Sequence, residues 1–297
     1  MSIRWGVSPI AWANDDMPEL GGDTPLETIL RDISELGFDG VELGGKFPRD
    51  PETLAPLLRR HGLALVGGWY SGALLAHDAD AEIAALQEHL SLLEALGSKV
   101  FVFAETSNAI HGARGTPMST PPRLGPGDWA RFGERMTAVA GHVAARGLKF
   151  AYHHHLGTVV ETAADLDAFL AHTGESVGLT LDTGHAMLGG IDPVAVIDAH
   201  PGRIAHVHCK DIRRERHRAA LAAGRSFLDG VLDGMFTVPG DGSLDYAALM
   251  RALGRVGYSG WIVVEAEQDP ALADPRTFAE LGLRTLRQRA AEAGLAG

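Results

Sequence analysis

The stretch Val256-Gly-Tyr-Ser-Gly-Trp-Ile-Val-Val-Glu-Ala-Glu267 contains the unit from which this chain is built. A helix-like segment ends at a glycine, a short apolar strand follows, and charged residues come directly after the strand. Glycine just past a helix adopts the left-handed conformation at little steric cost, so Gly257 marks a helix end. The same phrase recurs at Leu36-Gly37-Phe38, His61-Gly62-Leu63, Leu96-Gly97-Ser98 and Arg146-Gly147-Leu148, with looser versions at Thr173-Gly174 and Pro201-Gly202.

These repeats predict eight strands, near residues 3–8, 39–43, 63–70, 98–104, 148–154, 177–182, 203–210 and 260–266. Apolar runs that alternate with amphipathic helices are typical of parallel βα units. Eight such units in 297 residues favour a closed (β/α)8 TIM barrel. No G-x-G-x-x-G follows a strand, so an open dinucleotide-binding sheet lacks its phosphate loop. We expect one α/β domain over residues 1–297, with long loops near 105–127 and 211–241, after strands four and seven.

Helix starts are also visible in the sequence. Thr24-Pro25-Leu26-Glu27 predicts a capping box with proline at the first helical position. Similar starts occur at Asp50-Pro51, Thr162-Ala-Ala-Asp165, Asp192-Pro193 and Asp274-Pro275.

Composition narrows the function classes. The formal net charge is −12, which disfavours nucleic acid and anionic lipid as main partners, because both need a basic surface. No secretory leader is recognisable, and no apolar stretch approaches the length of a membrane-spanning helix. Cys209 is the single cysteine, so no intrachain disulfide can form. We therefore expect a cytoplasmic protein.

Three clusters of acids and histidines follow apolar runs near the C-terminus: Asp182-Thr-Gly-His185, His206-Val-His-Cys-Lys-Asp211 and Glu265-Ala-Glu267. In a βα barrel, the carboxyl ends of the strands form the catalytic face. Carboxylates and an imidazole from separate strand ends suit a divalent metal with open positions. The alternative is a set of ion pairs that ties the barrel together, and three clusters on successive strands favour the metal site.

Side-chain alternation along a strand assigns faces within these clusters. His206, His208 and Lys210 share one face of strand seven, whereas Cys209 faces away as a packing residue. Glu265 and Glu267 share a face in the same way.

On strand five, His153 and His155 share a face, and His154 takes the other. Glu42 ends strand two among glycines that let a ligand approach the backbone. Further candidates for lining the cavity are Trp12, Asn14, Asp15 and Trp69, although each alone is more often a packing or capping residue.

The chain resembles the xylose-isomerase-like, divalent-metal TIM barrels, and among them the inosose (2-keto-myo-inositol) dehydratase family. The similarity runs nearly from end to end. The segments that carry it are Trp5–Trp12 with Asn14-Asp-Asp16, Gly40–Gly45, Tyr152–Thr158, Asp182–His185, His206–Asp211 and Gly260–Asp269.

The resemblance implies a bound divalent metal, Mn²⁺ or Co²⁺, held by Asp182, His208 and Glu265. The fourth ligand in the wider superfamily is a glutamate on strand five. Here that position is His153, so either the imidazole replaces the carboxylate or Glu161 folds back to supply it. The dehydratase family is also described as using glutathione.

The reaction implied is loss of water from a cyclic polyol ketone, scyllo-inosose, to give a trihydroxycyclohexane-1,2-dione. The resemblance suggests His155 as the base and Glu42 as the acid, with swapped roles as the alternative. Lys210 would stabilise the developing oxyanion and His185 would orient a hydroxyl. Contacts with the substrate are expected from Trp12, Asn14, Trp69, His206 and Glu267.

The same sequence features are compatible with other functions. A ketose epimerase or isomerase would use the same metal site and keep every hydroxyl. A non-catalytic sugar-binding barrel would bind without turnover, and a DNA-repair nuclease conflicts with the acidic charge. The long loops also leave a homo-oligomer open, because such loops are often lids or subunit contacts.

Overall fold

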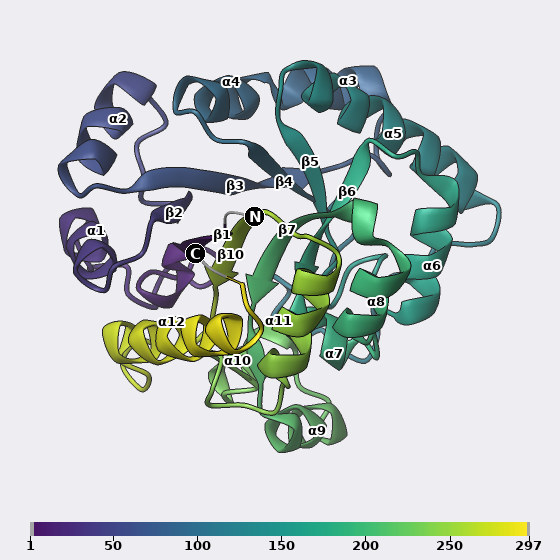
Figure 1. The fold of residues 1–297 in the computed structure, drawn as a ribbon. Coiled ribbons are helices and arrows are strands. Elements are labelled where there is room, and N and C mark those ends of the chain that lie inside the picture. Colours follow the sequence, from purple (N-terminus) through teal and green to yellow (C-terminus); the bar gives the residue numbers. More distant parts are fainter. Residues whose placement is uncertain (1–2, 296–297) are drawn as a thin grey trace.

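The computed structural model describes residues 3–295 and shows a closed barrel of eight parallel strands (Figure 1). Around the barrel the strands follow the order β1-β10-β7-β6-β5-β4-β3-β2. The predicted (β/α)8 fold is therefore confirmed. The barrel strands are β1 (Ile3–Val7), β2 (Gly40–Leu43), β3 (Ala64–Gly72), β4 (Val100–Glu105), β5 (Lys149–His153), β6 (Val177–Asp182), β7 (Ile204–Cys209) and β10 (Gly260–Val264).

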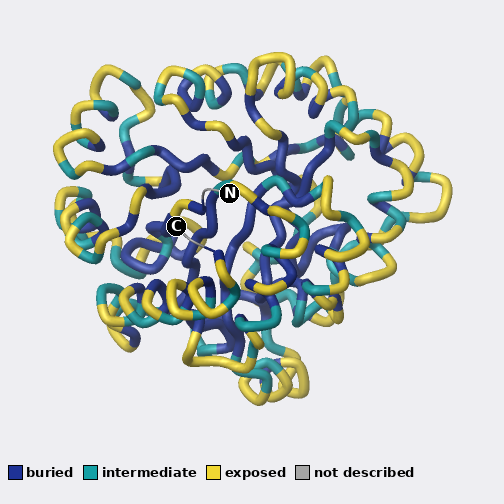
Figure 2. Tube along the Cα trace, in the orientation of Figure 1, coloured by how far each residue is buried: buried dark blue, intermediate teal, exposed yellow. Residues whose placement is uncertain are grey.

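Helices surround this barrel and expose their outer faces, whereas the strands are buried (Figure 2). The helices among the described residues are α1 (Leu26–Glu35), α2 (Pro51–Arg60), α3 (Ala79–Ala85), α4 (Gln87–Ala95), α5 (Asp128–Ala145), α6 (Ala163–His172), α7 (Thr183–Leu188), α8 (Pro193–Ala199), α9 (Arg214–Ala222), α10 (Phe227–Leu232), α11 (Tyr246–Arg255) and α12 (Pro275–Glu292).

The predicted helix starts are confirmed with one exception. The side chains of Asp50, Thr162, Asp192 and Asp274 all cap helices, and Thr162 forms the full capping box with Asp165. The capping box predicted at Thr24 is wrong. Pro25 stands in an extended conformation at the cap position of α1, so Thr24 lies one residue too early and makes no cap. The Glu27 carboxylate instead contacts His61 Nε2 at 3.0 Å.

The glycines at the predicted helix ends adopt positive φ, from 67° at Gly62 to 83° at Gly37. The two looser versions of the repeat have a different backbone conformation, because Gly174 and Gly202 are not among the glycines with positive φ. There the chain leaves the helix by another route, with Thr173 extended after α6 and a 3-10 turn at Pro201–Arg203.

The long segment after β7 contains its own secondary structure. It includes α9, α10 and a two-stranded sheet of β8 (Asp211–Ile212) and β9 (Phe236–Thr237). A backbone bridge between Pro117 and Ser226 joins it to the segment after β4. Apolar residues from both segments, Met118, Phe227 and Phe236 among them, form a second small core. The two predicted loops therefore pack together at one end of the barrel.

The lower interior of the barrel, at the amino ends of the strands, is filled by apolar side chains: Val66, Val100, Val102, Ala151, Trp261 and Val263. Gly40 makes room for the large ring, since a Cβ there would lie 2.7 Å from Trp261 Cη2 and from the Ala64 carbonyl oxygen. The Arg4 guanidinium covers the same ring at 3.9 Å from its centre. This apolar plug closes the barrel at the amino ends of its strands.

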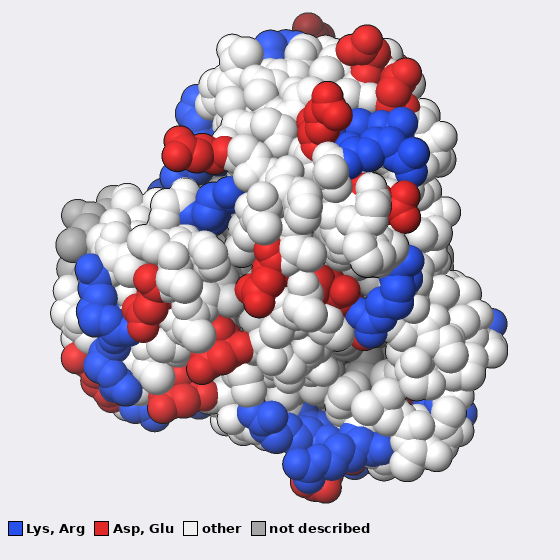
Figure 3. All heavy atoms as spheres, turned by 90° about the vertical axis from the view of Figure 1, so that its right-hand side faces the viewer, with Lys and Arg blue, Asp and Glu red and all other residues white. Residues whose placement is uncertain are grey.

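Charged side chains of both signs lie close together over much of the face shown in Figure 3. A basic group occupies its lowest part, the height at which Figure 1 places α9, which carries Arg214, Arg216 and Arg218.

Cys209 is buried in the main core, as predicted for a packing residue. Within residues 3–295, the helices are all too short or too polar to cross a membrane.

Candidate active site

A cavity of about 630 Å³ opens at the carboxyl ends of the strands. Its volume lies within the ordinary range for small-molecule sites. Residues predicted for the site that line it are Asn14, Asp15, Glu42, Trp69, His153, His155, His208, Glu265 and Glu267. Asp16, Lys46, Arg49 and His111 complete much of its polar lining.

Four side chains from β5 to β10 direct ligand atoms toward one another at the base of this cavity. Strand pairing places Asp182 of β6 beside His208 of β7. The Asp182 Oδ2 atom lies 3.6 Å from His153 Nε2 and 3.8 Å from His208 Nδ1. His208 Nδ1 also lies 2.6 Å from Glu265 Oε2. We refer to these four candidate metal ligands as the ligand group.

The ligand group has the donors that a divalent metal needs. His153, Asp182 and His208 can each offer one atom within 4.8 Å of the others. Asp182 Oδ2 is buried and has no hydrogen-bond partner within residues 3–295, although Oδ1 accepts from His185 N–H at 2.9 Å. The Lys210 ammonium lies 3.7 Å from this oxygen, too far for a hydrogen bond, so a metal ion would supply the direct partner that a buried carboxylate oxygen needs. The geometry therefore fits a metal ion.

Glu161, the alternative strand-five ligand, is engaged elsewhere. Its Oε2 accepts a 2.6 Å hydrogen bond from Gly157 N–H, and its Oε1 lies 3.7 Å from Arg123. It neither lines the cavity nor belongs to the buried ligand clusters found in the described chain. The structure thus brings His153, and not Glu161, to Asp182 and His208.

Lys210 is fully buried beside the ligand group. Its Nζ donates to Glu267 Oε1 at 2.5 Å and lies 2.7 Å from Glu265 Oε1 and 3.0 Å from His185 Nε2. Burial alone would lower the pKa of Lys210, but the carboxylates of Glu265 and Glu267 outweigh it and raise this pKa. The lysine is held as a cation among acids.

Glu267, on the same face as Glu265, lines the cavity. Burial raises its pKa to about 7, against the lowering effect of the Lys210 charge. Burial would also raise the pKa of Asp182, yet the Lys210 charge keeps that pKa below its usual value.

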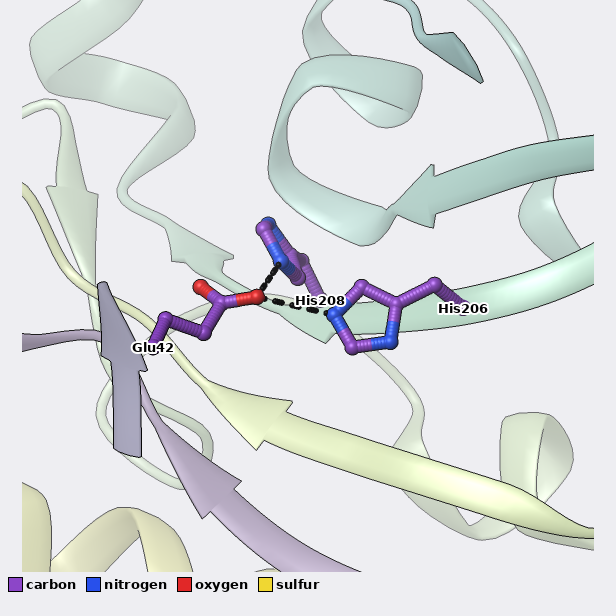
Figure 4. Close-up of side chains that lie close together, drawn as sticks. All are labelled: Glu42, His206 and His208. Carbon is purple, nitrogen blue, oxygen red and sulfur yellow. Dashed lines mark hydrogen bonds and ion pairs between the residues drawn. The ribbon is translucent and has the colours of Figure 1, made fainter. Parts of the chain in front are cut away.

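Glu42 accepts hydrogen bonds from two imidazoles on β7 through one oxygen atom (Figure 4). Its Oε1 lies 2.9 Å from His206 Nε2 and 3.0 Å from His208 Nε2. Burial raises the pKa of Glu42, but the two imidazoles more than offset this and bring it to about 2. In this arrangement Glu42 is an anion. His206 contacts Glu42 but does not line the cavity.

The rings of His155 and His185 are in close contact, with their centres 3.7 Å apart and their planes tilted by 37°. His155 Nδ1 lies 2.7 Å from the Leu156 carbonyl oxygen, so Nδ1 carries the proton and Nε2 is free to accept one. Burial and then the neighbouring His111 lower the pKa of His155 well below its usual value. Burial also lowers the pKa of His185. His185 does not line the cavity but holds Lys210.

The remaining predicted residues fall in different places. Trp69 lies at the cavity edge, 37% exposed, with its ring centre 5.1 Å from that of His153. His154 faces away and does not line the cavity. Trp12 is buried in the core and donates from its indole to Asp32 Oδ2 at 3.2 Å, because a 3-10 turn at Pro9–Ala11 directs it toward α1. It is absent from the cavity lining.

Sequence reasoning missed His111 and gave Asp16 no role. Both line the cavity. The available signal was that His111 is the single histidine in the Gly- and Pro-rich stretch 105–127, which follows a strand on the catalytic face.

Residues 30–289 match the family model of the xylose isomerase-like TIM barrels, and the chain belongs to this family. It is 47% identical to the rhizopine catabolism protein MocC of Rhizobium meliloti, over 99% of this chain and 90% of that protein. It is also 38% identical to the inosose dehydratase of Lacticaseibacillus casei, over 94% of both chains.

Among solved structures, the D-allulose 3-epimerase of a Methylomonas species superimposes with a TM-score of 0.67 at 19% identity. The match covers 97% of both chains. At this identity the likeness concerns the fold alone.

Proposed function

We propose that this chain is a divalent-metal-dependent hydro-lyase that removes water from 2-keto-myo-inositol (scyllo-inosose) to give a trihydroxycyclohexane-1,2-dione. The observation that carries the proposal is the joint presence of the buried ligand group and a neutral imidazole, His155, in one cavity. The whole-length similarity to an inosose dehydratase supports the choice of substrate. We place the activity in the cytoplasm, in the catabolism of inositol.

His153, Asp182, His208 and Glu265 would hold the metal, with Mn²⁺ or Co²⁺ as our choice. When bound, such an ion polarises a ketone oxygen and so acidifies the adjacent C–H bond. The Asp182 Oδ2 atom, which has no hydrogen-bond partner in the described chain, and the His208–Glu265 contact support this ligand set.

His155 is our candidate for removing the α-proton. Its Nδ1–H is fixed on the Leu156 carbonyl, so the Nε2 lone pair can take the proton as the C–H bond breaks. The tilted ring contact with His185 and the edge contact with Trp69 hold the ring in place. The departing β-hydroxyl then needs one proton to leave as water.

Glu42 is our candidate for delivering that proton. It is an anion in the resting geometry, so it must first take up a proton from solvent in the cavity that it lines, while His206 and His208 hold its Oε1 in place. The swapped assignment, with Glu42 as base and His155 as acid, uses the same two groups. Lys210 would place its positive charge near the oxygen on which negative charge develops.

A ketose epimerase is the second candidate. It would use the same ligand group and leave every C–O bond intact. The epimerase similarity rests on the fold at 19% identity, whereas the dehydratase similarity extends along the sequence at 38%. The dehydratase is therefore favoured.

Proton and carbon NMR of scyllo-inosose, incubated with the purified protein and Mn²⁺, tests the proposal. We expect the signals of two hydroxyl-bearing carbons to disappear as the dione forms, because one becomes the second carbonyl and the other a CH₂ group. Asp182→Asn, which keeps the shape of the side chain, should abolish the reaction. Epimerisation of a ketose without loss of water, or no change in inosose with any divalent metal, would overturn the proposal.

A further inference from the structure

We propose that Asn14, Asp16 and His111 form a recognition wall, a polar side of the cavity that binds hydroxyl groups of the cyclic polyol which do not react. The proposal rests on the function proposed above and assigns its substrate specificity. None of the three residues belongs to the ligand group or to the acid–base pair. Each of them lines the cavity. Asn14 Nδ2 and His111 Nδ1 are buried without a partner in the described chain, and Asp16 is exposed to the solvent that a ligand would displace.

Asn14 supplies a donor. Its Oδ1 accepts from the backbone N–H groups of Asp16 and Met17, each at 2.8 Å, which fixes the orientation of the amide. The opposite end, Nδ2, is buried and has no acceptor within residues 3–295. The side chain is only 3% exposed. A buried amide group with two unused hydrogens is costly, so a ligand oxygen is the natural partner.

Asp16 supplies an acceptor next to that donor. The Asn14 hydrogen bond holds the Asp16 backbone, and the carboxylate makes no hydrogen bond or ion pair with the described residues. An ionised carboxylate only accepts, and its two oxygens can take hydrogens from two hydroxyls at once. A hydroxyl both donates and accepts, so the pair of Asn14 and Asp16 is complementary to adjacent hydroxyls on a polyol ring.

His111 extends the wall from the segment after β4. Its Nδ1 is buried without a partner in the described chain, and its ring centre lies 4.8 Å from that of His155. The Ile110 N–H donates to the Gly157 carbonyl at 2.8 Å, which joins this segment to the loop after His155.

A second connection joins the segment after β4 to the one after β1. Arg114 pairs with Glu19, and Met118 packs in the same small core as Met17. The wall is therefore fixed relative to the candidate base. A polyol held against it keeps one position with respect to His155.

The test uses isosteric variants and one matched control. Asp16→Asn removes the carboxylate charge, and Asn14→Asp keeps the Oδ1 acceptor while it removes the donor. Asp23→Asn makes the same charge change in the same segment, at an exposed residue outside the cavity lining. Binding of scyllo-inosose is measured by calorimetry with each change in a His155→Gln background, where turnover does not obscure binding.

We expect Asp16→Asn and Asn14→Asp each to weaken inosose binding about tenfold, because a hydrogen bond with a charged or buried partner is lost. Asp23→Asn should leave the Kd unchanged. In the enzyme with His155 intact, Asp16→Asn should raise KM about tenfold and change kcat less than about threefold. A mono-deoxy inosose that lacks the contacted hydroxyl should bind the Asp16→Asn variant as well as the parent.

The outcomes separate the two proposals. If inosose is dehydrated normally and the wall variants bind it like the parent, the recognition wall is wrong and the dehydratase stands. If inosose is not dehydrated but its binding depends on Asp16, the wall stands and the dehydratase is wrong. Absence of inosose binding by the parent overturns both.

Discussion

The barrel interior is apolar at the amino ends of its strands and polar at their carboxyl ends. Trp261 and Val263 fill the lower end among other apolar side chains, whereas Glu265 and Glu267 continue the same face of the same chain at the upper end. Burial of apolar surface stabilises the fold, and burial of charged groups does so only when every partner is in place. The lower end therefore serves stability, and the upper end retains polar groups that only a function explains.

The largest effect on activity is expected from His155→Gln. Removing a proton-transfer group lowers kcat by about 10²- to 10⁴-fold. The unfolding free energy should change by only about 1 kcal/mol, because the amide can still donate to the Leu156 carbonyl. Turnover of inosose and chemical denaturation measure the two quantities.

His154→Gln is the matched control for that change. The neighbouring imidazole is fully buried but does not line the cavity. We expect it to alter stability and leave the kcat of the folded enzyme nearly intact. Equal losses of kcat in the two variants would show that the face assignment on β5 does not matter for chemistry.

A pair of tryptophans compares the two ends by the same substitution. Trp261→Ala should destabilise the protein by about 3–5 kcal/mol, since it opens a cavity in the apolar plug. Trp69→Ala, at an exposed position on the cavity edge, should cost about 0.5 kcal/mol and raise KM instead. Denaturation curves and steady-state kinetics would contradict the comparison if both variants lost stability equally.

A buried histidine outside the site gives a pH test. Burial lowers the pKa of His89 to about 4, with its Nε2 on the Gly68 carbonyl. Between about pH 6.5 and 4 the unfolded chain binds this proton and the folded chain does not, so stability falls as the pH falls through that window.

Because His89→Gln does not titrate, it should recover up to about 3 kcal/mol of the stability lost at pH 4, relative to its own stability at pH 7. The exposed His172→Gln is the control. An unchanged slope of stability against pH in the His89 variant would show that other groups account for the acid sensitivity.

A smaller effect on stability is expected at Gly40, which leaves space for the Trp261 ring in the apolar plug. Gly40→Ala places a Cβ 2.7 Å from the Ala64 carbonyl oxygen, a clash that costs about 1–3 kcal/mol. Gly141→Ala in α5 meets no atom within 4 Å and should be neutral or slightly stabilising. Equal stabilities of these two variants would contradict the packing described for Trp261.

The barrel was predictable from sequence because its signals are local. Each predicted helix end at Gly37, Gly62, Gly97, Gly147 and Gly257 is confirmed, and the strands fall within a few residues of their expected places. Alternation also grouped Lys210 with His206 and His208, and Glu265 with Glu267. The structure adds that Lys210 contacts both glutamates.

The parts of the site that could not be predicted depend on contacts between distant segments. Glu42 meets His206 across 164 positions of the chain, and no local pattern reports that contact. The choice between His153 and Glu161 depends on the Gly157 turn, which engages Glu161. The place of Trp12 depends on a 3-10 turn that alternation does not describe. Asp16 and His111 lie on loops whose course the barrel alone does not determine.

We propose that a metal ion held by His153, Asp182, His208 and Glu265 occupies the carboxyl end of the barrel. Anomalous diffraction at the manganese edge, from crystals grown with Mn²⁺, tests it most directly. We expect one strong peak in contact with all four side chains, which is lost in Asp182→Asn. A peak coordinated by Glu161, or no peak at the ligand group at saturating Mn²⁺, would contradict it.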